Sequence, residues 1–132
     1  MITFSVVTIT YNAAAVLRPT LDSVLMQNYP HVEHLIIDGA STDDTISIAK
    51  AYQKQSDDAE NGHIIKIQSE PDKGLYDAMN KGLQLATGDY IVFMNAGDRF
   101  PDAETLNKVM LAAVVGDGEE HPAVLFRNTD II

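Results

Sequence analysis

Four short polar clusters hold the side chains of this sequence that could do chemistry, and each directly follows an apolar run. The clusters are Thr10-Tyr11-Asn12, Asp38-Gly39, residues 70–74 and residues 95–98. If the apolar runs are parallel strands, their carboxyl ends meet at one edge of a sheet, and such sheets bind ligands at that edge. The spacing therefore predicts one binding site assembled from all four clusters.

Asp38 follows the apolar run Leu35-Ile36-Ile37, where a carboxylate could accept hydrogen bonds from a nucleotide base or ribose. The alternative is an acid that caps the start of a helix. Residues 38–45 hold more polar groups than one cap needs, and this favours a ligand for Asp38. Asp43 and Asp44 are better explained as acids at a helix N-terminus, which the helix dipole stabilises without any ligand.

Asp98 ends a loop after the apolar residues 91–94. A carboxylate there could hold one Mg²⁺ or Mn²⁺ whose other ligands are diphosphate oxygens and water, or it could be a turn or cap acid before Pro101. Tyr11 could stack on a base or cover the sheet edge, and Lys73 could pair with phosphate or be a solvated charge. The histidines, at positions 31, 34, 63 and 121, are too scattered to predict a metal site.

Strands and helices must alternate to position these clusters. β-branched and apolar runs predict strands at residues 4–9, 32–37, 63–69, 90–94 and 123–126. Apolar residues at helical spacing predict helices over 14–27, over 75–86 with Gly88 as the glycine after its end, and over 106–114. Residues 41–50 are expected to begin another helix, with Ser41 or Thr42 as its cap. Residues 55–62 have the composition of a surface connection. The alternation predicts an α/β fold with a mostly parallel sheet and helices on both faces.

Composition restricts the class of protein. A chain of 132 residues with 45% hydrophobic content is expected to form a single domain over residues 1–132. A net charge of −10 argues against nucleic acid or anionic lipid as a partner, and the absence of cysteine excludes disulfides and thiolate metal sites. We expect a cytoplasmic protein that could be membrane-associated in its full-length form. The glycine motifs of dinucleotide and triphosphate sites are absent.

Five segments resemble the family 2 glycosyltransferases in their order and spacing. They are SVVTITYN (residues 5–12), LDSVLMQNYP (21–30), EHLIIDGASTDDT (33–45), DKGLYDAMNKG (72–82) and ATGDYIVFMNAGD (86–98). The resemblance covers nearly the whole chain. It implies the GT-A fold, which is Rossmann-like, and a nucleoside-diphosphate sugar, usually a UDP- or GDP-sugar, bound with Mn²⁺ or Mg²⁺.

The resemblance also implies roles for single residues. Tyr11 and Asp38 match the residues that hold the base, and Asp98 matches the metal-binding acid of a DxD-like loop. The expected nucleotide-sugar site comprises Thr10, Tyr11, Asn12, Asp38, Lys73 and Asn95. Asn95 and Gly97 stand where relatives often have aspartate, so Asn95 can bond a ribose but a second carboxylate for the metal is missing.

The implied reaction is an inverting transfer to a saccharide or lipid-linked acceptor, as in polysaccharide or cell-envelope glycan biosynthesis. In the family, the acceptor site and the catalytic base lie well beyond the DxD-like loop, whereas only residues 99–132 follow it here. We therefore expect the N-terminal half of a GT-A domain, truncated before the acceptor-binding half, with no catalytic base identified. An apolar face left open by the missing half could mediate self-association.

Three other functions would suit an α/β domain of this size. A sugar-phosphate nucleotidyltransferase should have a loop rich in glycine and arginine after the first strand, and residues 10–15 read Thr-Tyr-Asn-Ala-Ala-Ala. A phospho-acceptor receiver domain needs an acidic pair at the same place, and it is absent. A domain that binds a nucleotide sugar without transferring it stays open as an alternative.

Overall fold

The computed structural model describes residues 2–115 and 124–127, with side chains as far as residue 112. Strands and helices alternate in these ranges: β1 (Phe4–Thr10), α1 (Ala14–Leu25), β2 (Val32–Asp38), α2 (Thr45–Ala59), β3 (Ile64–Ser69), α3 (Leu75–Leu85), β4 (Tyr90–Phe93), α4 (Thr105–Val115) and β5 (Val124–Arg127). In the described part of the chain, no helix is both long enough and apolar enough to span a membrane.

The strands form one sheet in the order β3-β2-β1-β4-β5. The first four are parallel to one another, and β5 runs antiparallel to β4. This confirms the α/β fold with a mostly parallel sheet. The carboxyl ends of the four parallel strands all lie at one edge, and the loops that follow these strands carry the four polar clusters.

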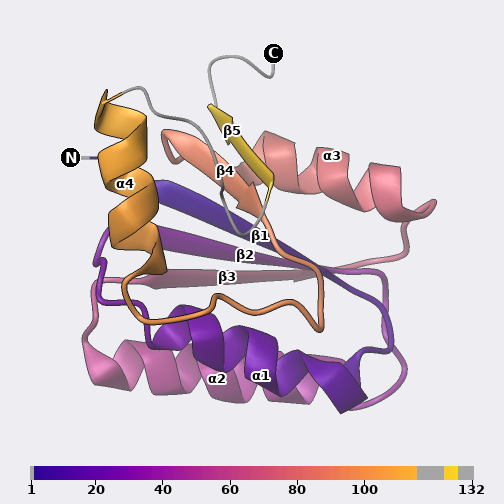
Figure 1. Ribbon diagram of the computed structural model, residues 1–132. Coiled ribbons are helices and arrows are strands. Elements are labelled where there is room, and N and C mark those ends of the chain that lie inside the picture. The colour runs from indigo at the N-terminus through magenta and orange to yellow at the C-terminus, as the bar shows by residue number, and fades with distance from the viewer. Residues whose placement is uncertain (1, 116–123, 128–132) are drawn as a thin grey trace.

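Helices cover both faces of the sheet, as Figure 1 shows, with α1 and α2 side by side on one face and α3 on the other. The α1–α2 layer packs Leu17, Leu21 and Tyr52 against Ile36 of β2. α4 lies against the α1 side of the sheet, with Leu106 in the cluster that contains β1 and β4 residues. α3 contributes Ala78 to the core of the opposite face.

The central strands are buried on both faces, because helices cover both. Every residue of β2 is buried, and so is nearly every residue of β1, which explains their continuous apolar runs. At the sheet edge, β3 alternates between exposed Ile64, buried Ile65 and exposed Lys66. Polar groups at the ends of β1 and β2 therefore lie inside the sheet, whereas those of β3 lie at its exposed edge.

The second helix differs from the sequence prediction at both ends. Its N-cap is Asp44 and not Ser41 or Thr42, because the Ser41 amide and hydroxyl bond the Asp38 carboxylate instead of capping a helix. It also runs to Ala59, through much of the segment that was expected to be a surface connection. Gln55, Asp57 and Asp58 are exposed on this helix, Ser56 is buried, and only residues 60–62 connect it to β3.

Gly88 was predicted to terminate α3, and this was wrong. The helix ends at Leu85, and the next residue, Ala86, is already extended. Gly88 is required by close packing instead: a Cβ there would lie 2.6 Å from Ser5 Oγ and 2.8 Å from the Thr3 carbonyl oxygen. The glycine therefore lets the chain pass close to the start of β1.

Glu60→Gly is expected to stabilise the protein by about 0.5–1 kcal/mol. Glu60 follows α2 with φ 50° and ψ 42°, a left-handed conformation in which a side chain costs free energy and glycine does not. Urea unfolding of Glu60→Gly against Glu60→Ala measures this. Alanine keeps the strained backbone, so equal stability of the two variants would show that the strain is not the cause.

Candidate functional site

Asp38 is the centre of a hydrogen-bond network that joins three strand ends. Thr10, Asp38 and Ser69 lie in register across β1, β2 and β3. Asp38 Oδ1 accepts hydrogen bonds from Thr10 Oγ1 (2.6 Å) and Ser41 Oγ (2.5 Å), and Oδ2 accepts from the Ser41 amide and Ser69 Oγ (both 2.8 Å). A carboxylate has about four acceptor positions, so these donors occupy its capacity.

The electrostatics of Asp38 fit this arrangement. Its side chain is nearly inaccessible, with 1% exposure, and burial alone would raise its pKa. The hydrogen bonds from Ser41, Thr10 and Ser69 outweigh burial and leave the pKa of Asp38 below its ordinary value. Asp38 is thus an ionised carboxylate that organises the strand ends and the turn after β2.

Asn12 fixes the same turn from the other side. It adopts a left-handed conformation with φ 47°, which asparagine tolerates better than most residues. Its Oδ1 accepts hydrogen bonds from the backbone amides of Thr42 (2.8 Å) and Asp43 (3.3 Å), and the backbone amide of Asn12 donates to Ser41 Oγ (2.8 Å). Asn12 and Asp38 therefore position residues 41–43 beside the end of β1.

Asp43 connects the N-termini of two helices. Its Oδ1 accepts from the Thr45 amide (3.0 Å) and its Oδ2 from the Ala14 amide (3.1 Å), at the first residues of α2 and α1. The Thr45 hydroxyl also donates a hydrogen bond to Asp43 Oδ1. This bond lowers the pKa of Asp43 most, and the bonds from the two backbone amides lower it further. The expectation that Asp43 serves helix N-termini agrees with this geometry, although Asp43 precedes α2 and does not lie in its first turn.

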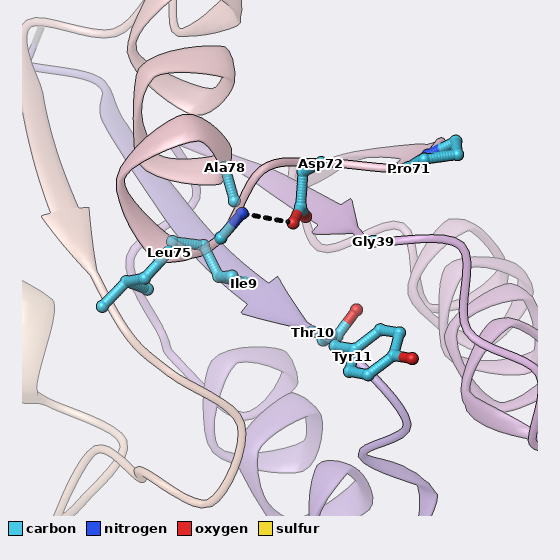
Figure 2. A pocket seen from close by; sticks show the side chains of 9 residues that line it. Ile9, Thr10, Tyr11, Gly39, Pro71, Asp72, Leu75 and Ala78 are labelled. Atoms are coloured by element: carbon cyan, nitrogen blue, oxygen red, sulfur yellow. Dashed lines mark hydrogen bonds between the residues drawn. The ribbon is translucent and has the colours of Figure 1, made fainter.

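A pocket of about 560 Å³ opens beside this network, between the ends of β1 and β2 and the start of α3 (Figure 2). Its volume is typical of sites for small molecules. Tyr11, with 66% of its surface exposed, lies at one side. The residues that line it are Ile9, Thr10, Tyr11, Gly39, Pro71, Asp72, Gly74, Leu75 and Ala78. The structure therefore brings three of the four clusters together.

Lys73 lies in the loop between β3 and α3, next to this pocket in sequence but not among its lining residues. Its side chain is exposed, and its backbone amide donates to Asp77 Oδ2 at 2.9 Å. The amide bond closes the turn into α3. The role of the Lys73 ammonium group toward phosphate stays a prediction.

The fourth cluster forms a tight loop after β4. The backbone amide of Asn95 donates to Asp98 Oδ2 (3.0 Å), and the backbone amide of Asp98 donates to the backbone carbonyl oxygen of Asn95 (2.9 Å). Gly97, with φ 102°, makes the turn, and its amide donates to Thr20 Oγ1 of α1 (2.8 Å). Both Asn95 and Asp98 are exposed at the carboxyl edge of the sheet.

A metal at this loop would need ligands beyond those that the described residues offer. Among the described residues, no group of three or more acids, histidines or cysteines could enclose an ion. Asp98 presents an exposed carboxylate, which suits Mg²⁺ or Mn²⁺ that is otherwise held by phosphate oxygens and water. Asp98 therefore fits a shared metal site and not a site made by protein alone.

Sequence reasoning missed Asp72 as an individual site residue, although it belongs to one of the four clusters. Its carboxylate lies above Gly39, where a Cβ would come within 2.7 Å of Asp72 Oδ2. The available signal was its place directly after the third strand. That signal alone does not mark a site residue, because an acid before a helix is common without any ligand.

Comparison with known proteins decides the family. Residues 5–117 match the family model described as Glycosyl transferase family 2. The chain belongs to this family. It is 40% identical over 116 residues to the PGL/p-HBAD biosynthesis glycosyltransferase of Mycobacterium tuberculosis, a match that covers 88% of this chain and 43% of that protein. The chain thus spans less than half the length of that curated relative.

Two solved structures share the fold of this chain. The mannosyltransferase PcManGT from Pyrobaculum calidifontis, in complex with GDP-Man and Mn²⁺, superposes with a TM-score of 0.74 at 28% identity, over 83% of this chain and 31% of that one. TarS of S. aureus in complex with UDP-GlcNAc superposes with a TM-score of 0.72 at 24% identity, over 86% of this chain and 31% of that one. These matches confirm the GT-A fold, of which the chain forms the N-terminal portion.

Proposed function

We propose that this chain binds the nucleoside-diphosphate sugar donor of a glycosyltransferase that transfers the sugar, with inversion, to a saccharide or lipid-linked acceptor. The observation that carries the proposal is the convergence of an exposed tyrosine, a pocket and an exposed carboxylate at the carboxyl edge of the sheet. Family membership and the mycobacterial relative, which is named a PGL/p-HBAD biosynthesis glycosyltransferase, support it. The solved structure of PcManGT, which is 28% identical to this chain, is a complex with GDP-Man and Mn²⁺.

The residues divide into those that contact the donor and those that hold the others in place. Tyr11 provides an aromatic face for the base, Asn95 a polar side chain for the ribose, and Lys73 a charge for the diphosphate. Thr10, Asn12 and Asp38 keep the turn after β2 in position through their hydrogen bonds. This division keeps every residue of the predicted site and makes Asp38 a positioning residue.

Asp98 is the residue that would hold Mn²⁺ or Mg²⁺ together with the donor. When bound, the ion neutralises diphosphate charge and stabilises the leaving nucleotide. The protein has a net charge of −10, so a diphosphate approaching an acidic surface benefits from a bridging cation. Because Asp98 is one carboxylate, metal and nucleotide should each bind weakly alone and strengthen each other.

We expect Mn²⁺ to raise the affinity for a nucleoside diphosphate by about tenfold or more, and Asp98→Asn to abolish this gain, because one carboxylate charge links the ion to the protein. Calorimetry with GDP and UDP, in Mn²⁺ and then in chelator, measures it. Asp58→Asn is the matched control, since Asp58 is an exposed acid of α2 paired with Lys54. Equal affinity with and without metal in folded protein would remove Asp98 from the metal role.

A further inference from the structure

Asp72 places a carboxylate in the pocket beside Tyr11. It comes from the loop between β3 and α3, and its side chain points toward the space bounded by Thr10, Tyr11 and Leu75 (Figure 2). Asp72 Oδ1 accepts one hydrogen bond, from the Gly74 amide at 3.0 Å. Oδ2 lies over Gly39, within contact distance of any side chain that replaced the glycine. The pocket thus has an acceptor group on a mainly apolar lining.

Asp38 cannot serve as the acceptor in this pocket without breaking its own bonds. It is buried, is not among the pocket's lining residues, and takes four hydrogen bonds from Thr10, Ser41 and Ser69. Breaking the bond from Thr10 would leave a buried hydroxyl group unpaired, which is costly. A base that stacks on Tyr11 therefore meets the carboxylate of Asp72 and not that of Asp38.

An ionised carboxylate accepts hydrogen bonds and donates none, and it binds best to two adjacent N–H groups. Guanine offers such a pair at N1 and N2. Uracil offers one N–H, at N3, between two carbonyl oxygens that a carboxylate repels, and adenine has no adjacent pair of ring and exocyclic donors. We propose that Asp72 reads the nucleobase and selects a guanosine over a uridine diphosphate donor. This inference rests on the proposed function and specifies its substrate.

Gly39 leaves the space that the Asp72 carboxylate occupies. Its backbone conformation is one that alanine can adopt, but the added Cβ would lie 2.7 Å from Asp72 Oδ2 and 3.2 Å from Asp72 Cγ. The atoms in conflict belong to the end of a movable side chain, so Gly39→Ala should fold and displace the carboxylate. It therefore perturbs the acceptor without removing its charge.

The test is calorimetry with GDP, UDP and IDP in Mn²⁺. IDP retains the N1–H of guanine but lacks the 2-amino group. We expect GDP to bind wild-type protein at least about tenfold more tightly than UDP, with IDP between them, since a charge-assisted bond contributes about that factor. Asp72→Asn and Gly39→Ala should bring GDP within about threefold of UDP. Asp58→Asn, which removes an exposed acid of α2 that pairs with Lys54, should change nothing.

The outcomes separate the inference from the proposed function. If UDP binds as tightly as GDP, or if Asp72→Asn weakens both equally with an unchanged melting temperature, Asp72 does not read the base, while donor binding stands. If wild-type protein binds neither nucleotide in the presence of Mn²⁺, the proposed function fails and the inference fails with it. A preference for GDP that survives both Asp72→Asn and Gly39→Ala assigns base reading to another group and overturns the inference.

Discussion

Asp38→Ala is expected to lower the free energy of unfolding by about 2–4 kcal/mol, because it removes a buried carboxylate from four protein donors. Thr10 Oγ1, the Ser41 amide and hydroxyl, and Ser69 Oγ would all lose their acceptor. The turn after β2 would lose its fixed position together with them. Nucleotide affinity should fall as well, because Asn12 and Tyr11 border that turn. Urea unfolding and nucleotide titration of the same samples measure the two effects.

Asp44→Ala is the matched control for this loss. Asp44 lies six residues further along the same segment, is exposed, and makes no side-chain cap hydrogen bond to α2. Its removal should change stability by no more than about 0.5 kcal/mol. If Asp38→Ala were as stable as Asp44→Ala but had lost its nucleotide affinity, Asp38 would be a direct ligand contact and its internal hydrogen bonds would contribute little.

The positions of the site clusters could be predicted from the sequence because one rule places them. Parallel strands end at a common edge, so a polar cluster after each apolar run must reach that edge. The pairing of Thr10 with Asp38 and the pocket beside Tyr11 agree with this rule. The rule needs only the strand ends, and buried β-branched runs mark those well.

What each polar side chain does could not be predicted in the same way. Ser41 can cap a helix or bond an aspartate, and only the three-dimensional position of Asp38 decides between them. Gly88 can end a helix or permit close packing, and only its distance to Ser5 and Thr3 shows the second. Both errors arise from contacts with residues remote in sequence or from competition for one hydrogen-bond partner, which a local pattern does not contain.

The free energy of unfolding should fall by about 2 kcal/mol between pH 7 and pH 5 because of His34 alone. His34 is fully buried in β2, with Nε2 2.7 Å from Thr8 Oγ1 and Nδ1 2.7 Å from the Tyr52 hydroxyl. Burial, and after it the charge of His63, lowers the pKa of His34 from 6.5 to about 3. Below pH 6.5, His34 therefore becomes protonated in the unfolded chain but stays neutral in the folded chain. Stability is complete above that pH and is lost progressively as pH falls toward 3.

Urea unfolding at intervals from pH 7.5 to pH 5 separates the loss due to buried histidines from that of the carboxylates, because the lowered pKa values of Glu33 and Asp38 place their losses at more acidic pH. His63, whose pKa burial also lowers, adds a loss of the same sign. His34→Gln can keep polar contacts with Thr8 and Tyr52 while removing the titrating group, so it should be less stable at pH 7.5 and show a shallower decline. A full slope in His34→Gln would assign the acid sensitivity to His63 and leave His34 as a neutral structural group without influence on it.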